Sequence, residues 1–573
     1  MLATFLCAAP LLAAPAHAAG DISDRTALRE VLRHQARASA GSIVPLPLPE
    51  APASTLPRAS AASVSRELAS IARSGRPERV LVGARTHGGV PSLAAALRRL
   101  GARPEVFEAI GVLAATVPSG AALVARLQDD PRVAYIERDR ELRVATDPFD
   151  VVDPETGVKY TWAYDGVRAG EALAAAGGGS RRTVAVIDTG LDLTHPEFTG
   201  RVARTFDTAS GGTDVTDFVG HGTFVTGLIA AVDGNGIGGK GVAGTTRVIA
   251  VRGSTDGGFT VRALIRGLEF SVRHGADVVN LSLAGQGFTR SQARALEGAF
   301  INDVLPVAAS GNRGLQGNPL EFPAAALGGR RGGRGIGLSV SATKPDGGFG
   351  LFSTHNEFVS LAAPGAGPSG CAFGVFSTLP AGSTEWDDPK LSCSRVFTSG
   401  SARYAYGEGT SFAAPIAAAM AALAWHVEPR LASEQVADLM MRSAHQTMGK
   451  GWNEFTGAGV VDGSAATTLA RRYDVSSPRV HASARRLGSR IAVRIRGSRD
   501  RTEGGRELAG RVTYGLVVSR DGGRNFSTVV RQRRRPFRRT ISIQGRRANV
   551  LIATVCDANG NCGVKRLGRF AAR

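Results

Sequence analysis

The chain has few cysteines, few aromatic residues and little long apolar sequence. Its 573 residues include 5 Cys, and aromatic residues make up 6% of the total. Beyond the apolar stretch Leu2–Leu12, no segment of about 18 uncharged apolar residues stands out, so no membrane-spanning helix is predicted. Gly and Pro are spread without a period, which disfavours collagen-like and solenoid architectures.

What is present suits a secreted protein of several domains. Apolar residues make up 43% of the chain, and its length exceeds what one hydrophobic core fills. Residues 1–19 resemble a signal peptide, because Leu2–Leu12 is followed by the small-x-small pattern Ala16-His17-Ala18, although no Lys or Arg lies near Met1. Residues 20–78, rich in Ala, Ser and Pro, predict a mobile linker.

The positive charge is concentrated at one end of the chain. The net charge is +20, and residues 471–573 hold 26 Lys and Arg against 6 Asp and Glu, whereas the rest is balanced. A basic domain of this kind could bind an anionic cell-surface polymer. Arg-rich coding from a GC-rich genome explains the same excess. No nucleic-acid-binding motif accompanies it, so no specific nucleic acid is predicted.

Cysteine use fits export. Cys7 would leave with the signal peptide, and four cysteines then remain, which favours two disulfides in an exported protein. Pairing sequence neighbours joins Cys371 to Cys393 and Cys556 to Cys562. Four cysteines allow three pairings, and the sequence does not choose among them. A zinc site would need suitably spaced His partners, which the chain lacks.

Three short motifs contain the groups that nucleophilic acyl chemistry needs. They are VAVIDTG around Asp188, HGTFVTG beginning at His221 and GTSFAAP around Ser411. A serine hydroxyl attacks a carbonyl well only when an imidazole takes its proton and a carboxylate orients that imidazole. Taken singly, Ser411 would be read as a helix cap, His221 as a surface or core residue and Asp188 as a turn former.

Together, the three motifs in the order Asp, His, Ser resemble the subtilisin-like serine peptidases over roughly residues 150–470. Two positions depart from the family pattern, since Phe224 and Thr226 stand where His and Ala are more common. The resemblance implies a serine-type endopeptidase of polypeptide substrates that needs no cofactor for its chemistry. It implies a nucleophile at Ser411, a general base at His221 and an orienting carboxylate at Asp188.

The pattern of apolar runs predicts an α/β fold. Short β-rich runs alternate with helical ones between residues 183 and 425, which favours a doubly wound parallel sheet covered on both faces. Sites in such sheets lie beyond the carboxyl ends of the strands. Asp188 follows one strand and Asn312 follows another, in agreement with that rule.

The resemblance also implies further site residues. Asn312 would be the oxyanion donor, although Gly-Asn is also a good turn pair. Two small-residue segments would bind the substrate, one by strand addition and one as a wall of the main specificity pocket. They comprise Ser282, Leu283, Ala284 and Gly285, and Ala309, Ser310 and Gly311. A structural calcium ion is expected at Glu197, Asp233, Asn235, Ile237 and Gly239, with Glu where the family pattern often has Asp.

Two flanking domains complete the prediction. Residues 79–145 read as β-α-β-β-α-β, a ferredoxin-like order that resembles the inhibitory propeptide of subtilisin-like peptidases. An unrelated α+β domain would show the same order. Residues 475–573 read as short alternating strands, which favours a basic β-sandwich of immunoglobulin or fibronectin type. The catalytic domain would span residues 150–472.

The sequence therefore predicts a secreted, self-processing serine endopeptidase, extracellular or associated with the cell envelope, with its own propeptide as intramolecular inhibitor. The self-processing bond is expected between residues 141 and 159. A different class of function, binding by a peptidase-like scaffold without catalysis, would usually have lost a catalytic residue. The chain retains all three catalytic residues and Asn312.

Overall fold

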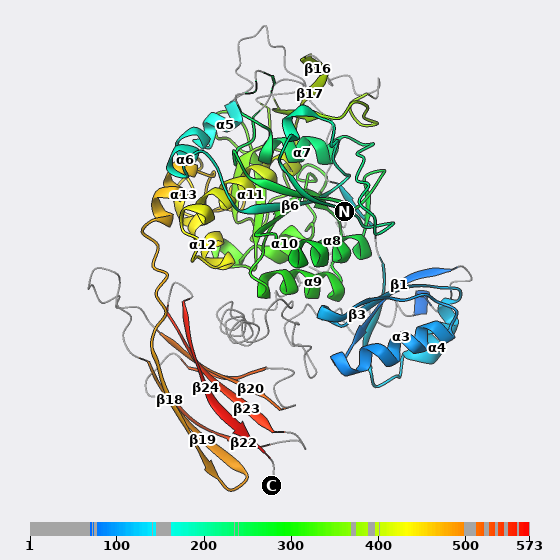
Figure 1. Cartoon of the computed structure of the whole chain (residues 1–573), viewed down its shortest axis with the longest axis vertical. Coiled ribbons are helices and arrows are strands. Elements are labelled where there is room, and N and C mark those ends of the chain that lie inside the picture. The colour runs from blue at the N-terminus through cyan, green and yellow to red at the C-terminus, as the bar shows by residue number, and fades with distance from the viewer. Residues whose placement is uncertain are drawn as a thin grey trace, which may run out of the picture.

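The computed structural model describes most of the chain from residue 69 onward (Figure 1). The described residues are 69–71, 73, 77–139, 141–144, 162–367 apart from 234, 236 and 239, 374–387, 396–399, 401–497, 512–520, 527–532, 537–543, 548–557 and 561–571. Several predicted features lie outside this part: the signal peptide, most of the linker, Cys371, Cys393 and Gly239, which was expected to bind calcium.

An N-terminal domain forms a four-stranded sheet with two helices on one side (Figure 1). Its elements are β1 (Glu78–Ala84), α3 (Val90–Arg99), β2 (Glu105–Phe107), β3 (Val112–Val117), α4 (Gly120–Leu127) and β4 (Val133–Arg138). The strands lie in the order β2-β3-β1-β4, and β1 pairs antiparallel with β3 and β4. Ile71 is fully buried in this domain's core, so the ordered domain begins before the predicted linker boundary at residue 78.

The central domain contains a parallel sheet of seven strands in the order β14-β13-β12-β10-β6-β8-β7. Its strands are β6 (Thr183–Asp188), β7 (Val202–Asp207), β8 (Arg247–Arg252), β10 (Val278–Leu281), β12 (Leu305–Ala309), β13 (Leu338–Thr343) and β14 (Leu361–Pro364). The alternation of strands and helices in the sequence predicted this doubly wound sheet.

Both faces of the sheet are buried, and β6 shows why its sequence is continuously apolar. Val184 and Val186 pack into one core, while Ala185 and Ile187 pack into the other. Successive side chains of a strand point to opposite faces, so both sets must be apolar when both faces are covered. The helices of this domain are α5 (Trp162–Gly166), α6 (Ala169–Ala175), α7 (His221–Ala230), α8 (Val261–Arg273), α9 (Arg290–Ile301), α10 (Ala324–Leu327), α11 (Thr410–Val427), α12 (Ser433–Ser443) and α13 (Gly463–Ala470).

Helix α11 runs through the larger of the two cores. It is long and apolar enough by composition to cross a membrane, which corrects the expectation that no such segment exists after the N-terminus. However, 89% of that segment is buried inside the fold. Its small Ala side chains let α7, α12 and α13 and the sheet approach closely, so its apolar character serves the core.

Two small sheets lie beside the large one. One has the order β11-β5-β9, where β5 (Glu141–Val144) follows the N-terminal domain, β9 is Gly258–Thr260 and β11 is Leu283–Ala284. The other has the order β15-β17-β16, from β15 (Val375–Leu379), β16 (Val396–Ser399) and β17 (Ala402–Gly407).

The C-terminal region forms two antiparallel sheets, β18-β19-β22 and β21-β20-β23-β24. Their strands are β18 (Val480–Leu487), β19 (Arg490–Gly497), β20 (Thr513–Ser519), β21 (Ser527–Gln532), β22 (Phe537–Ser542), β23 (Asn549–Cys556) and β24 (Cys562–Phe570). Residues from both sheets, such as Ile491 and Leu551, share one apolar cluster. Cys556 and Cys562 form a disulfide, as the pairing of sequence neighbours predicted.

Candidate active site

The side chains of Asp188 and His221 meet at one edge of the seven-stranded sheet. Asp188 ends β6 and His221 begins α7, and the Nδ1 atom of His221 lies 2.7 Å from Asp188 Oδ1. Asp188 Oδ1 also accepts a 2.7 Å hydrogen bond from the Thr189 backbone N–H. Both side chains are buried, at 0% exposure for His221 and 1% for Asp188. Burial alone would favour the neutral imidazole, but the charge and hydrogen bond of Asp188 outweigh it and raise the pKa of His221.

A second carboxylate organises the start of α7. Asp217 Oδ2 accepts hydrogen bonds from the Thr223 backbone N–H at 2.8 Å and from its hydroxyl at 2.7 Å. Asp217 Oδ1 accepts a 2.8 Å hydrogen bond from the Thr189 hydroxyl, and the Gly222 N–H donates to that hydroxyl oxygen at 2.8 Å. Asp217 thus satisfies first-turn amide groups of α7 and ties them to the residue after Asp188. No motif in the sequence points to Asp217.

Ser411 lies in the first turn of α11, and the residue after it, Phe412, packs near His221. Gly409 precedes the helix with φ of +154°, within the region that favours glycine. The Phe412 ring lies 5.5 Å from the His221 ring, centroid to centroid. The hydroxyl of Ser411 lies 3.4 Å from the carbonyl oxygen of Ser282. Ser411 therefore lies at the carboxyl edge of the sheet, the edge at which Asp188 ends β6.

The side-chain amide of Asn312 has a defined orientation. Its Oδ1 atom accepts hydrogen bonds from the Thr410 backbone N–H at 3.0 Å and from the Thr410 hydroxyl at 2.7 Å. Because a backbone N–H can only donate, the oxygen of the amide must face Thr410. The Nδ2 end, which can only donate, consequently faces away from Thr410.

The segment 141–144 lies in the predicted substrate groove. Strand β5 is the middle strand between β9 and β11, and all the pairings are antiparallel. Val144 pairs with Leu283 and Arg143 with Ala284, two of the residues expected to bind substrate by strand addition. Gly285 exchanges two backbone hydrogen bonds with Phe322, at 3.0 and 2.9 Å. The Phe322–Pro323 peptide bond is cis.

The predicted pocket wall, Ala309–Gly311, follows the end of β12. Ala309 is the last residue of the strand, and the Ser310 N–H donates to the Val340 carbonyl at 2.8 Å. A side chain at Gly311 would lie within 1.9 Å of the Glu321 carboxylate. Glu321 accepts a 2.5 Å hydrogen bond from the Thr354 hydroxyl, and burial raises its pKa. This acidic group beside the wall has no sequence signature that could have revealed it.

A further acidic side chain, Glu385, packs near His221. Its backbone N–H donates to the Val219 carbonyl at 3.3 Å, two residues before His221. Burial raises the pKa of Glu385 to about 8, with the His221 charge opposing the shift and Asp188 and Asp217 adding to it. A lone Glu in a loop gives no signal in sequence, so only the fold reveals this neighbour.

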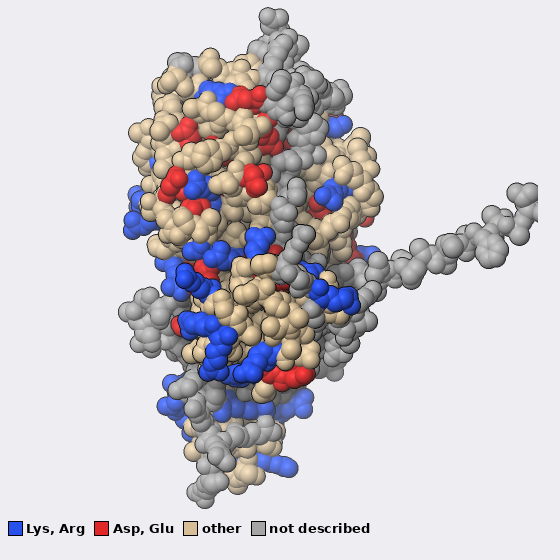
Figure 2. Space-filling model, turned by 90° about the vertical axis from the view of Figure 1, so that its right-hand side faces the viewer, with Lys and Arg blue, Asp and Glu red and all other residues tan. Residues whose placement is uncertain are grey.

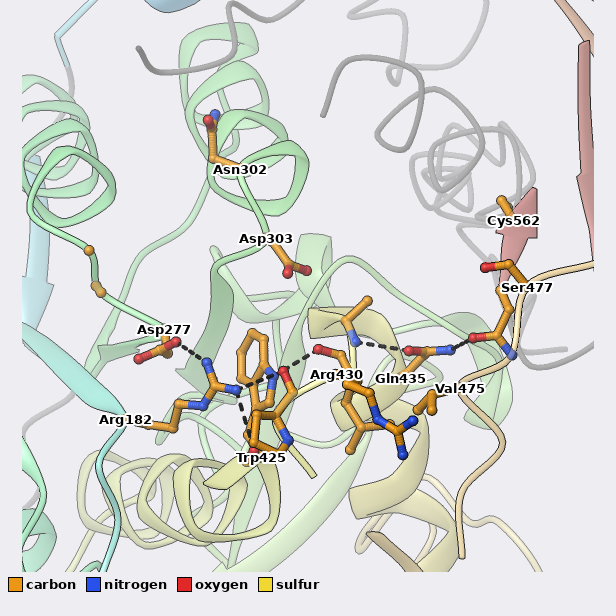
Figure 3. Close-up of a pocket in the computed structure, with 16 residues that line it drawn as sticks. Arg182, Asp277, Asn302, Asp303, Trp425, Arg430, Gln435, Val475, Ser477 and Cys562 are labelled. Atoms are coloured by element: carbon orange, nitrogen blue, oxygen red, sulfur yellow. Dashed lines mark hydrogen bonds and ion pairs between the residues drawn. The ribbon is translucent and has the colours of Figure 1, made fainter. Parts of the chain in front are cut away.

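A separate cavity of about 560 Å³ lies at the opposite edge of the sheet (Figure 3). It is lined by Arg182 and Asp277, which precede β6 and β10, and by Asn561 and Cys562 of the C-terminal region. Gln435 Nε2 donates a 2.7 Å hydrogen bond to Asn561 Oδ1 across it. The cavity is therefore at a junction between domains and is not the groove that holds β5.

Comparison with known proteins identifies the class. Residues 179–459 match the model of the Subtilase family. The chain is 31% identical over 363 residues to M-protease of Shouchella clausii, covering 63% of this chain and 80% of that protein. It is 29% identical over 323 residues to the Thermophilic serine proteinase of Bacillus sp. strain AK1, covering 55% and 70%. The chain belongs to the subtilase family and is a serine peptidase.

A solved structure supports the fold. Fervidolysin from Fervidobacterium pennivorans, described as a keratinolytic enzyme related to subtilisin, aligns with a TM-score of 0.55 at 18% identity. The alignment covers 86% of this chain and 91% of fervidolysin. At this identity the likeness concerns the fold, and the central domain has the subtilisin-like parallel sheet.

Proposed function

We propose that the chain is a secreted serine endopeptidase, made as a self-processing precursor. Asp188, His221 and Ser411 act as the catalytic triad, and Asn312 supplies an oxyanion donor. One observation carries the proposal: the buried 2.7 Å contact between His221 Nδ1 and Asp188 Oδ1, near the first turn of α11, which contains Ser411. Membership of the subtilase family supports it.

The chemistry follows from this arrangement. Asp188 holds the Nδ1–H of neutral His221, which leaves the Nε2 lone pair to take the proton of Ser411. The Ser411 oxygen then attacks the scissile carbonyl, and His221 passes the proton to the leaving amine. Water, activated by His221, releases the acyl group from Ser411. Asn312 Nδ2 and the first-turn N–H of Ser411 donate to the oxyanion of each tetrahedral intermediate.

A serine substitution tests the proposal. Ser411→Ala should abolish casein hydrolysis and labelling by a fluorophosphonate, and the precursor should accumulate uncut. Ser483→Ala, on an exposed part of β18, is the matched control and should retain both activities. Casein hydrolysis by Ser411→Ala at the wild-type rate would refute the proposed nucleophile.

We also propose that the N-terminal domain is the inhibitory propeptide, as the ferredoxin-like order suggested. Its contacts with the peptidase domain support this role. Glu137 accepts hydrogen bonds from the backbone N–H groups of Arg290 and Ser291, at 3.2 and 3.0 Å. Asp139 accepts a 2.7 Å hydrogen bond from the Arg262 N–H. These carboxylates satisfy the first-turn amides of α9 and α8, where negative charge is favoured.

The bond cut during maturation is proposed to be Ala145–Thr146. Strand β5 ends at Val144, which pairs with Leu283. The next enzyme residue in that direction is Ser282, whose carbonyl oxygen lies 3.4 Å from the Ser411 hydroxyl. We propose that the register continues by one residue, which would bring the Ala145 carbonyl to the nucleophile. N-terminal sequencing of the mature enzyme should begin at Thr146, and a mature terminus elsewhere would contradict this assignment.

The basic C-terminal domain is proposed to hold the enzyme on an acidic polysaccharide of the cell envelope. In sheet β18-β19-β22, Ile491, Val493 and Ile495 point into the core, so the alternate residues of β19 point outward. The register places Arg494 directly opposite Arg538, and these three strands contain no Asp or Glu.

Like charges directly opposite one another destabilise a sheet unless an anion lies between them. The Nε atom of Arg494 is buried without a hydrogen-bond partner among the described residues. On the side seen in Figure 2, the lowest part of the molecule also shows Lys and Arg without Asp or Glu. Planar guanidinium groups suit carboxylates, and the scarcity of aromatic residues disfavours base stacking with single-stranded nucleic acid.

Binding to polygalacturonate beads tests this role. In the catalytically inactive Ser411→Ala protein, the change Arg494→Ser with Arg538→Ser should lower retention at least about tenfold, because two paired cations are lost. Lys565→Ser with Arg566→Ser removes the same charge from β24 and should lower retention much less. Equal losses in the two variants, or stronger retention by DNA or anionic vesicles, would refute this face as a polysaccharide site.

A further inference from the structure

The turn that the sequence matched to a calcium site is already closed by hydrogen bonds. The Glu197 side chain is fully buried, and both of its carboxylate oxygens accept hydrogen bonds from side chains. Oε1 accepts from the Tyr404 hydroxyl at 2.9 Å, and Oε2 accepts from Asn235 Nδ2 at 2.9 Å. The acidic group expected to bind the ion therefore faces donors, which compete with a cation for the same lone pairs.

The orientation of Asn235 also disagrees with a calcium ligand. Its Oδ1 atom accepts a 3.1 Å hydrogen bond from the Ile237 backbone N–H. Rotating the amide would place its NH₂ group against that N–H, so the oxygen has to face Ile237. The NH₂ group consequently points at Glu197. Calcium needs six to eight oxygen ligands, and here an amide donor stands where an oxygen would be required.

Tyr404 occupies the space beside this turn. It comes from β17, far along the chain, and is 1% exposed. A side chain at Gly238 would lie within 2.2 Å of the Tyr404 ring, so the ring packs directly against the turn. His195, two residues before Glu197, also packs against the Tyr404 ring, edge to face, at 5.4 Å between ring centroids. The donor set and the packing therefore do not fit calcium at these residues.

We propose that Tyr404 takes the structural role of a cation in this turn. Its hydroxyl and the Asn235 amide donate hydrogen bonds to buried Glu197, and its ring packs against Gly238. Tyr404 thereby joins Asn235 and Gly238 to β17. The turn is then held by the protein alone, and its stability does not depend on calcium. The inference concerns the fold of the peptidase domain and is independent of the proposed catalytic roles.

Thermal unfolding of the full-length Ser411→Ala protein, which cannot digest itself, tests this inference. The melting temperature should be the same in excess EDTA and in excess calcium chloride. Tyr404→Phe keeps the ring but leaves a buried carboxylate oxygen without its donor, so it should lower the melting temperature by about 2–6 °C in both solutions. Tyr406→Phe, two residues along the same strand, is the matched control and should change it less.

Glu197→Gln distinguishes this turn from any other calcium site. A drop in melting temperature on adding EDTA that Glu197→Gln abolishes would overturn the proposal, because it would place a bound calcium ion at Glu197. A drop that persists unchanged in Glu197→Gln would assign the ion elsewhere and support the proposal. An unchanged melting temperature in Tyr404→Phe would also overturn it.

Discussion

Val144 of β5 pairs in antiparallel register with Leu283 of β11. The pairing places the end of the N-terminal domain in the groove beside Ser411, although about 140 residues separate the two strands. Backbone hydrogen bonds give such a strand its affinity, whereas side-chain pockets give it specificity.

Interrupting the β5 backbone should slow maturation. Arg143 pairs with Ala284 on one side and with Gly258 on the other. Arg143→Pro removes its N–H and should slow cleavage of the precursor by about tenfold or more, the effect of losing roughly 1.4 kcal/mol of binding. Arg143→Ala retains the backbone and should mature at close to the wild-type rate. A pulse-chase of the secreted protein measures both rates. Equal rates for the Pro and Ala variants would contradict the strand pairing as the means of presentation.

The fall of kcat/KM at low pH should depend on the contact between Asp188 and His221. Asp188 raises the pKa of His221, and only the neutral imidazole can take a proton. On acidification, kcat/KM of the mature enzyme should therefore fall at a higher pH than an ordinary imidazole would give. Asp188→Asn should move this limb to lower pH and reduce kcat by about 10⁴-fold, as in other serine peptidases. An acid limb at the same pH in the variant would contradict the assignment.

Stability should fall as the pH rises through the range in which Glu385 ionises. Its pKa is raised to about 8 in the folded state from 4.5, so between these values the folded protein binds more protons than the unfolded chain. The free energy of unfolding therefore decreases with rising pH across this window. We expect Glu385→Gln, in the Ser411→Ala background, to lose less free energy of unfolding between pH 5 and pH 8 than the parent protein. Urea titrations at about these two pH values measure the difference.

Glu454→Gln is the matched control for that measurement, because Glu454 is an exposed carboxylate away from the site. It should leave the pH dependence unchanged. If Glu385→Gln showed the same slope as wild type, the buried carboxyl would not be the titrating group.

The junction near the cavity should control whether the C-terminal sheets unfold with the peptidase domain. Asn561 Nδ2 donates to the Asp474 carbonyl at 2.9 Å, and Asn561 Oδ1 accepts from Gln435. Asn561→Ala leaves a buried Gln435 amide without that acceptor, at a cost of about 1–3 kcal/mol. Calorimetry should show an earlier transition for the C-terminal sheets. Ser477→Ala, which lines the same cavity, should unfold as wild type does, and identical traces for both variants would count against the junction.

Local sequence patterns determined much of the fold and the candidate site. Asp188, His221 and Ser411 were predicted because their three motifs, in this order, resemble those of the subtilisin-like serine peptidases. Each motif also joins an apolar run to a turn or a helix start, where a side chain can project from the sheet edge. The unbroken apolar run Val184–Ile187 indicates a strand buried on both faces. In the structure, Val184 and Val186 pack into one core, and Ala185 and Ile187 pack into the other. These are short-range features, so they can be read without knowing what lies opposite.

Only the tertiary structure decided which distant groups meet. Glu385 and Asp217 surround His221, Glu321 lies against Gly311, and Tyr404 binds Glu197 from more than 200 residues away. Asn235 and Glu197 resemble calcium ligands in sequence because both side chains carry oxygen atoms. The sequence does not tell whether those oxygens already accept hydrogen bonds from other parts of the protein. The hydrogen-bond partner of a buried polar atom often comes from a distant segment of the chain. Only folding brings such segments together, so the sequence alone does not identify the partner.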